Sequence, residues 1–156
     1  MRGNEKIIAL LNDFLADELT AISQYMVHSE MCANWGYEKL HETVEKRAIG
    51  EMKHAEKLIA RILFLEGQPV VSNLNKMSIG PTVEAQLKHD LDAEAGAIQA
   101  YNDGIRLCLE IGDNGSRELI EANLHDEEEH LDWPETQLDQ INQLGLQNYL
   151  LAQLAE

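Results

Sequence analysis

The sequence predicts an all-α protein in which four long helices form a bundle, with a long crossover between the second and third helices and a short fifth helix at the C-terminus. Composition gives the first indication, because 44% of the 156 residues are apolar, only 5% are aromatic and three are proline. That balance is typical of helical domains rather than of sandwiches or barrels. Apolar residues also recur at steps of three and four over long segments, which is the helical period. The length suits one domain spanning residues 1–156.

Breaks rich in glycine, asparagine and proline divide the chain into helical segments. The expected helices are the segment closed by Asn34-Trp35-Gly36, Glu38 to about Glu66, the segment from a Thr82 cap to Gly112, the segment from a Ser116 cap to about Gln143, and Leu146 to Leu154. The connection from Gly67 to Pro81 reaches about 50 Å when extended, enough to return along the whole bundle. Pro134 lies inside the fourth segment and predicts a bend there, because proline cannot donate a hydrogen bond to the carbonyl of His130.

Six polar residues lie on the otherwise apolar helix faces and form two sets of three. Adding 76 to each member of the first set gives the second, and the sets are Glu18, Glu51 and His54, then Glu94, Glu127 and His130. Other residues repeat at the same offset, among them Tyr25 with Tyr101. Amphipathic helices match by chance at leucine and alanine, but not at Glu, His and Tyr together. We therefore expect two helical hairpins related by a pseudo-twofold axis.

Counting from the hairpin turns places the six side chains in one layer. Glu18 lies as many residues before Gly36 as His54 lies after it, a distance of about 27 Å along each helix at about 1.5 Å per residue. The second hairpin gives nearly the same depth for Glu94 and His130. All six residues are therefore expected at the middle of the bundle.

Four carboxylates in one buried layer need a counter-charge, which two divalent cations supply. One Glu and one Glu-x-x-His from each helix pair is the ligand pattern of di-iron and di-manganese bundles. Mixed glutamate and histidine ligation favours iron or manganese over zinc. We expect Glu51 and Glu127 to bridge the two ions and Glu18 and Glu94 to bind one ion each. The structural alternative is a charged network neutralised by a basic residue such as Arg47, one turn away.

Charge and hydropathy restrict the partners. The net charge of −16 argues against binding to nucleic acid or anionic membranes. The sequence contains no run of 18 apolar residues, and between its first charged residues and Asn12-Asp13 it has no apolar segment as long as the h-region of a signal peptide. We therefore expect neither a membrane span nor a signal peptide, and a cytoplasmic protein. Cys32 and Cys108 have no metal-binding spacing and are expected to be reduced and packed.

With these residues in place, the chain resembles the bacterioferritins. The strings that carry the resemblance are NDFLADELTAISQY around Glu18, EMKHAE around Glu51, RILFLEG at 61–67, DEEEHLDW around Glu127 and GLQNYL near the end. The resemblance covers essentially the whole chain. It implies a ferritin-like bundle and a hollow shell of 24 subunits that stores ferric mineral. It also implies a ferroxidase centre with two Fe per subunit, which uses dioxygen or peroxide. A small ferredoxin-type electron donor is a further expected partner.

The resemblance also implies haem b between two subunits on a twofold axis, with one methionine from each as axial ligand. That methionine corresponds to Met52, which points away from Glu51 and His54 on a helix, although an ordinary interface methionine would do the same. The family residue matching Tyr25 lies near the metal site and supplies an electron, whereas Tyr101 fits either a similar place or simple core packing. Some family members carry a His and an acidic residue on the cavity side, where this chain has Lys46 and Gly50, so it departs from the inner-surface iron site of those members.

Two alternatives use similar sequence features. A rubrerythrin-like peroxidase has a related metal core, but usually adds a Cys-x-x-Cys iron domain that this sequence lacks. A non-catalytic haem or iron carrier would hold iron at the same six residues as a static store. Rapid oxygen-dependent oxidation of added Fe(II) distinguishes an enzyme from a carrier.

Overall fold

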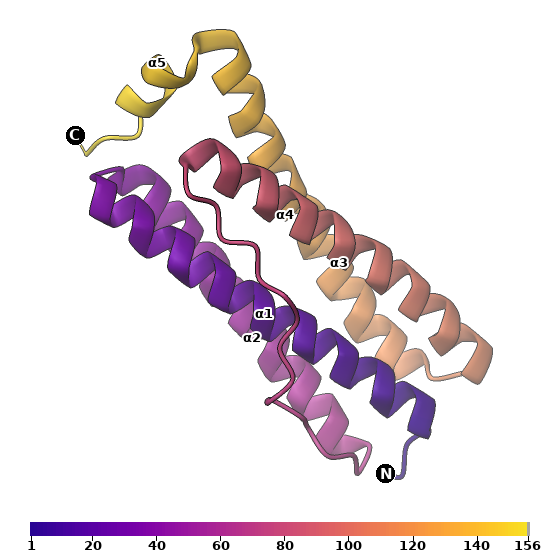
Figure 1. Ribbon diagram of the computed structural model, residues 1–156. Coiled ribbons are helices and arrows are strands. Elements are labelled where there is room, and N and C mark those ends of the chain that lie inside the picture. Colours follow the sequence, from indigo (N-terminus) through magenta and orange to yellow (C-terminus); the bar gives the residue numbers. More distant parts are fainter. Residues whose placement is uncertain (156) are drawn as a thin grey trace.

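The computed structural model describes residues 1–155; Glu156, the last residue of the expected domain, lies outside this range. The helices are α1 (Glu5–Trp35), α2 (Glu38–Phe64), α3 (Val83–Ile111), α4 (Asn114–Leu144) and α5 (Leu146–Leu151). α1 packs against α2 and α3 packs against α4, and the two hairpins lie side by side (Figure 1). The predicted bundle, with its long crossover between α2 and α3 and its short fifth helix, is confirmed.

Two glycines end helices where the sequence predicts an end. Gly36 and Gly112 follow α1 and α3 with φ of 86° and 85°, in the left-handed region that glycine adopts without steric cost. At the start of α3, the hydroxyl of Thr82 accepts the backbone N–H of Ala85 at 3.2 Å, as expected of an N-cap.

The start of α4 differs from the prediction. Asp113, and not Ser116, is the N-cap: its carboxylate accepts the backbone N–H of Ser116 at 3.0 Å. Arg61 of α2 donates to the same carboxylate at 2.9 Å, which ties the two hairpins together. Aspartate caps a helix as well as serine does, and here it gains the guanidinium as a second partner. α5 ends at Leu151, before the expected Leu154.

The fourth helix continues through Pro134, which is buried within it. Proline removes one backbone hydrogen bond from the helix but does not end it here. The bend expected at this position stays a prediction.

The crossover, residues 65–82, runs parallel to α1 and lies against it (Figure 1). Four α1 side chains accept backbone N–H groups along it: Asn12 from Val70 (2.9 Å), Thr20 from Asn75 (2.8 Å), Gln24 from Ser78 (3.1 Å) and His28 from Gly80 (2.9 Å). These bonds satisfy backbone groups that have no helix or sheet to pair with. The crossover is therefore fixed along α1 at several successive turns.

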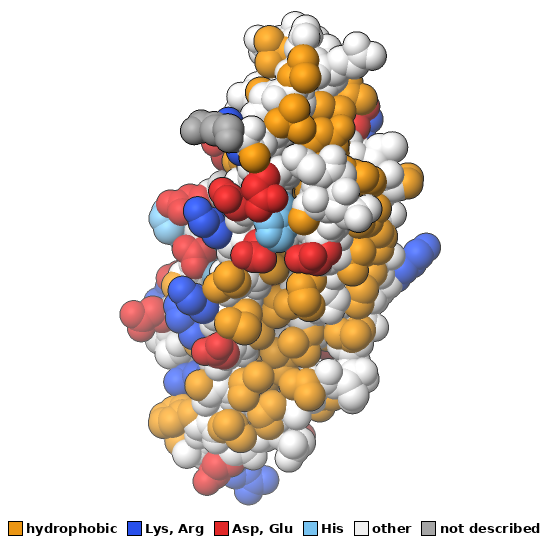
Figure 2. Space-filling model, turned by 90° about the vertical axis from the view of Figure 1, so that its left-hand side faces the viewer, with side chains coloured by type: hydrophobic (Ala, Val, Ile, Leu, Met, Phe, Trp, Pro, Cys, Tyr) orange, Lys and Arg blue, Asp and Glu red, His pale blue; other side chains and the backbone are white. Residues whose placement is uncertain are grey.

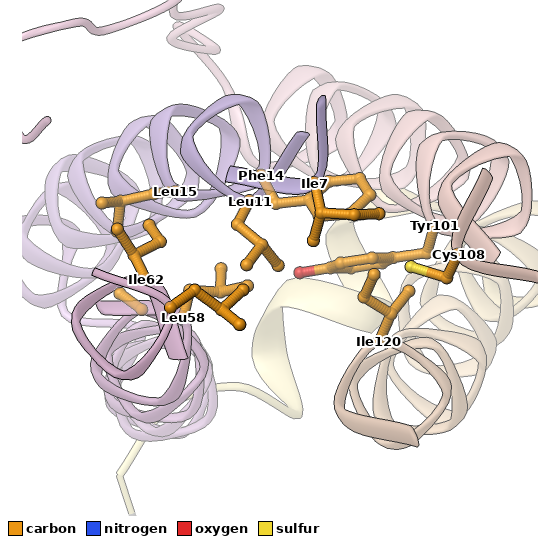
Figure 3. Packing of buried hydrophobic residues seen from close by; sticks show 11 residues of the cluster. Ile7, Leu11, Phe14, Leu15, Leu58, Ile62, Tyr101, Cys108 and Ile120 are labelled. Atoms are coloured by element: carbon orange, nitrogen blue, oxygen red, sulfur yellow. The ribbon is translucent and has the colours of Figure 1, made fainter. Parts of the chain in front are cut away.

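Apolar clusters fill both ends of the bundle. One cluster includes Ile7, Leu11, Leu58 and Ile120, and a second cluster at the other end includes Tyr149. Figure 3 shows the first cluster, in which the ring of Tyr101 lies among apolar side chains and its hydroxyl points toward the middle of the bundle. The polar layer described next lies between the two clusters.

The outer face of the first hairpin is unusually apolar. The exposed large apolar side chains on α1 and α2 include Met26, Val27, Ile49, Met52 and Phe64. Figure 2, which shows the side of the molecule where α1 and α2 lie, displays apolar side chains gathered over much of this face. Within residues 1–155, no helix has the length and apolarity needed to cross a membrane.

Candidate metal centre

The six residues predicted as ligands converge at the middle of the bundle. Glu18 comes from α1, Glu51 and His54 from α2, Glu94 from α3, and Glu127 and His130 from α4. Five of them are buried, with no more than 3% of their surface exposed. The side chain of His130 is the exception, with 21% of its surface exposed.

The six side chains form two groups of four that overlap. The first group is Glu18, Glu51, His54 and Glu127, and the second is Glu51, Glu94, Glu127 and His130. Within each group, one oxygen or ring nitrogen from every residue lies within 4.8 Å of the others. Glu51 and Glu127 belong to both groups. Each group therefore takes three residues from one hairpin and one glutamate from the other.

The two histidines face the carboxylates through the same ring atom. Nδ1 of His54 lies 3.1 Å from an oxygen of Glu51 and 3.1 Å from an oxygen of Glu127. Nδ1 of His130 lies 3.4 Å from Glu51 and 3.7 Å from Glu127. The rings are stacked with centroids 6.2 Å apart. Both imidazoles thus direct one nitrogen into the carboxylate layer, and His54 does so more closely.

Two tyrosines bind the glutamates of the opposite hairpin. The hydroxyl of Tyr25 donates to Glu94, and the hydroxyl of Tyr101 donates to Glu18. Tyr101 is therefore more than core packing, although its ring also packs on Phe14 with centroids 4.5 Å apart. The two tyrosines hold equivalent positions in the two halves of the repeat.

Several oxygens and one nitrogen in this layer have no hydrogen-bond partner within residues 1–155. They are Glu18 Oε2, Glu51 Oε1, Glu94 Oε2 and His130 Nδ1. Unpaired buried polar atoms are costly, and here each of them belongs to a residue of the two overlapping groups. A donor set of carboxylate oxygens and imidazole nitrogens fits divalent iron or manganese.

Without a metal ion, protons and internal ion pairs must balance the charge of this layer. Burial raises the pKa of Glu51, and the neighbouring Glu18 and Glu127 raise it further. Burial likewise raises the pKa of Glu94 to about 10. Burial opposes the charge on His54, but its contacts with Glu127, Glu18 and Glu51 raise its pKa above the ordinary value. Burial also acts against ionised Glu127, yet its hydrogen bonds, first to His54, lower its pKa to about 2. Two bound cations would replace these protons.

A cavity of about 410 Å³ leads from the surface to the centre. Its buried lining includes Glu18, Tyr25, Glu94 and Glu127, and its more exposed lining comes from α1, α3 and the crossover, at Asp17, Asn75, Lys76, His89 and Asp92. Carboxylates thus occur both at the surface and at the centre. The cavity gives a small cation a path to the six residues.

Sequence reasoning missed two polar contacts near the centre. Asp126 lies 2.8 Å from Nε2 of His54 and fixes the outer side of that ring. Asp90 of α3 accepts from Gln24 at 2.9 Å and lies 2.9 Å from Nδ1 of His28, and all three residues are buried. Neither contact appears in the repeat, because the residue that corresponds to Asp126 is Gly50 and the one that corresponds to His28 is Gly104. The repeat therefore gave no signal for either.

Other residues singled out from the sequence lie outside the centre. Met52 is on the outer face of α2 and 45% exposed, pointing away from the carboxylates as predicted. Lys46 is exposed on α2. Gly50 faces α4, where a Cβ on it would lie 3.9 Å from Cε1 of His130.

A four-helix bundle in which each hairpin supplies one Glu and one Glu-x-x-His defines the class of ferritin-like carboxylate proteins. A family model described as "Ferritin-like domain" matches residues 8–144. A bacterioferritin of Rhodobacter capsulatus is 41% identical over 155 residues, which is 99% of this chain and 96% of that protein. A bacterioferritin of Mycobacterium leprae is 40% identical over 149 residues, 96% of this chain and 94% of that protein. A bacterioferritin of Brucella melitensis is also 40% identical over 149 residues, 96% of this chain and 92% of that protein. The chain belongs to the bacterioferritin family, and the resemblance read from the sequence is confirmed.

Proposed function

We propose that this protein is an iron-storage ferroxidase that oxidises Fe(II) at the buried glutamate–histidine centre. The observation that carries the proposal is the pair of overlapping ligand groups that share Glu51 and Glu127, in which four of the six residues have an unpaired buried atom. Two Fe(II) ions bring four positive charges to four carboxylates. The centre is then neutral, as a buried site requires.

The six residues have distinct roles in this proposal. Glu51 and Glu127 bridge the two ions because they belong to both groups. Glu18 and His54 complete one subsite, and Glu94 and His130 complete the other, so we name them the Glu18–His54 subsite and the Glu94–His130 subsite. Fe(II) enters through the carboxylate-lined cavity. A pair of ions gives up two electrons, which reduce one dioxygen to peroxide or one peroxide to water.

Tyr25 is better placed than Tyr101 to take part in electron and proton transfer. It borders a small cavity that is also lined by Arg47, Asp90 and Trp133. Of these neighbours, the carboxylate of Asp90 can accept the phenolic proton when an electron leaves the ring, whereas Arg47 and Trp133 can only donate hydrogen bonds. Tyr101 lies instead against Phe14 and other apolar side chains. We propose that Tyr25 can supply one electron and its phenolic proton in place of one Fe(II), becoming a tyrosyl radical that a further Fe(II) reduces, and that Tyr101 orients Glu18.

We further propose that copies of the chain assemble through the apolar outer face of α1 and α2 into a hollow shell of 24 subunits. Met52 lies on that face with its thioether exposed. Next to a second copy it would supply one axial ligand to haem b shared across a twofold axis. The haem, when bound, would provide an electron path for reductive release of the stored iron. Size-exclusion chromatography with full-spectrum detection tests both parts, through a very large assembly and a Soret band.

Stopped-flow absorbance after mixing Fe(II) with metal-free protein in oxygenated buffer tests the ferroxidase activity. The wild-type chain should show a fast rise from Fe(III) formation. Glu18→Ala and His130→Ala should each lose that phase by more than about 100-fold, since even outer contacts of metal ligands are worth about 10–100-fold. Glu129→Ala is the matched control, because Glu129 lies beside His130 but, among residues 1–155, pairs only with the exposed His125. A fast phase that survives in both ligand variants would refute the assignment, and no fast phase in the wild-type chain would indicate an iron carrier.

A further inference from the structure

The two halves of the centre differ in the residue that supports the histidine. On the His54 side, Asp126 lies 2.8 Å from Nε2 and holds the outer edge of the ring. Subtracting 76 from 126 gives the corresponding position on the His130 side, which is Gly50. The pseudo-twofold relation of the hairpins therefore brings a carboxylate to one imidazole and no side chain to the other.

The structure around His130 agrees with this correspondence. A Cβ on Gly50 would lie 3.9 Å from Cε1 of His130, an ordinary van der Waals contact, and would meet no other side chain beyond its chain neighbours within 4 Å. A side chain at position 50 would therefore lie directly beside the ring. Within residues 1–155, no hydrogen bond or ion pair holds Nε2 of His130, and 21% of its side chain is exposed, against 3% for His54. The Nδ1 atom of His130 also lies farther from the shared glutamates than that of His54.

From these contacts we infer that the two subsites hold divalent cations unequally: the Glu18–His54 subsite fills first and tightly, the Glu94–His130 subsite is the exchangeable one, and Asp126 and Gly50 set the difference. The inference rests on the proposed function, because it requires the centre to bind metal. Asp126 acts as a positioning residue: it fixes the orientation and the tautomer of the His54 ring, and it makes Nδ1 a more basic, stronger metal ligand. His130 has no such support.

Anaerobic titration of the assembled, metal-free protein with Co(II), followed by visible absorption, measures both steps. The wild-type protein should bind two equivalents in two steps separated by about 10-fold or more. Gly50→Asp should strengthen the second step about 10-fold and bring the steps together. Gly50→Asn, which adds a side chain of the same size without charge, should do so much less. Asp126→Asn should weaken the first step, whereas Glu129→Gln, which removes an exposed charge from the same helix, should leave both steps unchanged.

Location is tested by anomalous scattering from crystals of the wild-type protein loaded with one equivalent of Zn(II). The signal should lie mainly at the Glu18–His54 subsite. Equal occupancy, preference for the Glu94–His130 subsite, or a Gly50→Asp effect no larger than that of Gly50→Asn would overturn the inference and leave the proposed function standing. Failure to bind either cation would overturn both.

Discussion

Tyr101 donates its hydroxyl hydrogen bond to Glu18 of the other hairpin. The same contact recurs between Tyr25 and Glu94, which lie at the corresponding positions of the repeat. The constant offset in the sequence therefore corresponds to a spatial relation. A tyrosine of each hairpin holds a buried glutamate of the other hairpin.

The two tyrosines are expected to differ when each is changed to phenylalanine. Tyr101→Phe should lower the unfolding free energy of the metal-free protein by about 1–3 kcal/mol, because Glu18 loses a buried donor. Tyr25→Phe should have a similar cost but should slow iron oxidation more than Tyr101→Phe. Urea unfolding and stopped-flow absorbance give the two quantities, and Tyr37→Phe, which removes no side-chain hydrogen bond between residues described by the structure, is the control. Equal oxidation rates in the two variants would contradict the proposed role of Tyr25.

Stability of the metal-free protein should fall as the pH rises from about 5 to about 9. Burial raises the pKa of Glu94 from 4.5 to about 10, and the pKa of Glu51 moves in the same direction. In this range the folded chain keeps protons that the unfolded chain has lost. The stability that these protons provide is complete below the unfolded pKa and is lost as the pH rises toward the folded one. Thermal unfolding followed by circular dichroism measures the trend.

Added divalent cation should remove most of this pH dependence, because the cation takes the place of the protons. A saturating ion at about 100 times its dissociation constant adds about 2.7 kcal/mol. Glu94→Gln should flatten the dependence of the metal-free protein without any metal. A melting temperature that rises with pH in the metal-free wild-type chain would show that these carboxyl groups are not protonated in the folded state.

Met52→Leu should abolish haem binding while leaving Fe(II) oxidation unchanged. Met52 lies on the outer face of α2 and is 45% exposed, so leucine keeps the apolar volume and removes only the sulfur ligand. The Soret absorbance per subunit reports haem, and the stopped-flow trace reports oxidation. Met26 is another exposed methionine, which lies on α1, and the control Met26→Leu should retain the Soret band. Full haem occupancy in Met52→Leu would exclude Met52 as the ligand.

His28→Ala should destabilise the protein by about 3 kcal/mol, because it removes two buried contacts and creates a cavity. The backbone N–H of Gly80 loses its acceptor, and the carboxylate of Asp90 keeps only Gln24 of its two partners. Urea unfolding measures the change. The control His125→Ala affects a side chain that is 76% exposed and should change stability by less than about 0.5 kcal/mol. Similar stability for the two variants would mean that the His28 contacts contribute little.

Much of the fold was predictable because its signals are local or repeat. The recurrence of apolar residues at steps of three and four predicted the helices, and the glycines predicted where they end. The constant offset of 76 residues predicted two related hairpins, with Glu18 and His54 at the same depth in the bundle. The N-cap of α4 was missed because Ser116 and Asp113 are both good caps, and the choice depends on Arg61 from another helix. The depth of a residue along a helix can be counted from the sequence, but its hydrogen-bond partner on a neighbouring helix cannot be identified in this way.

The same limit applies to the centre. Its six residues were predictable because they repeat, whereas Asp126 was missed because its counterpart is a glycine. The contact between His28 and Asp90 was missed for a related reason, since Gly104 and Phe14 occupy the corresponding positions and pack as apolar neighbours. Where the two halves differ, the repeat gives no information and only the folded structure shows the contact.

The location of the carboxylates between the hairpins also has a consequence for the order of folding. Each hairpin has its own short turn and extensive internal packing, so it can form from contacts close in sequence, which form quickly. The step that joins the hairpins brings together Glu51 and Glu127, which come from different hairpins and meet in both groups, and so it needs either protons or a cation to balance their charge. Iron supply would then govern the last step of folding, and a newly made chain would complete its core most readily when the ion it stores is present.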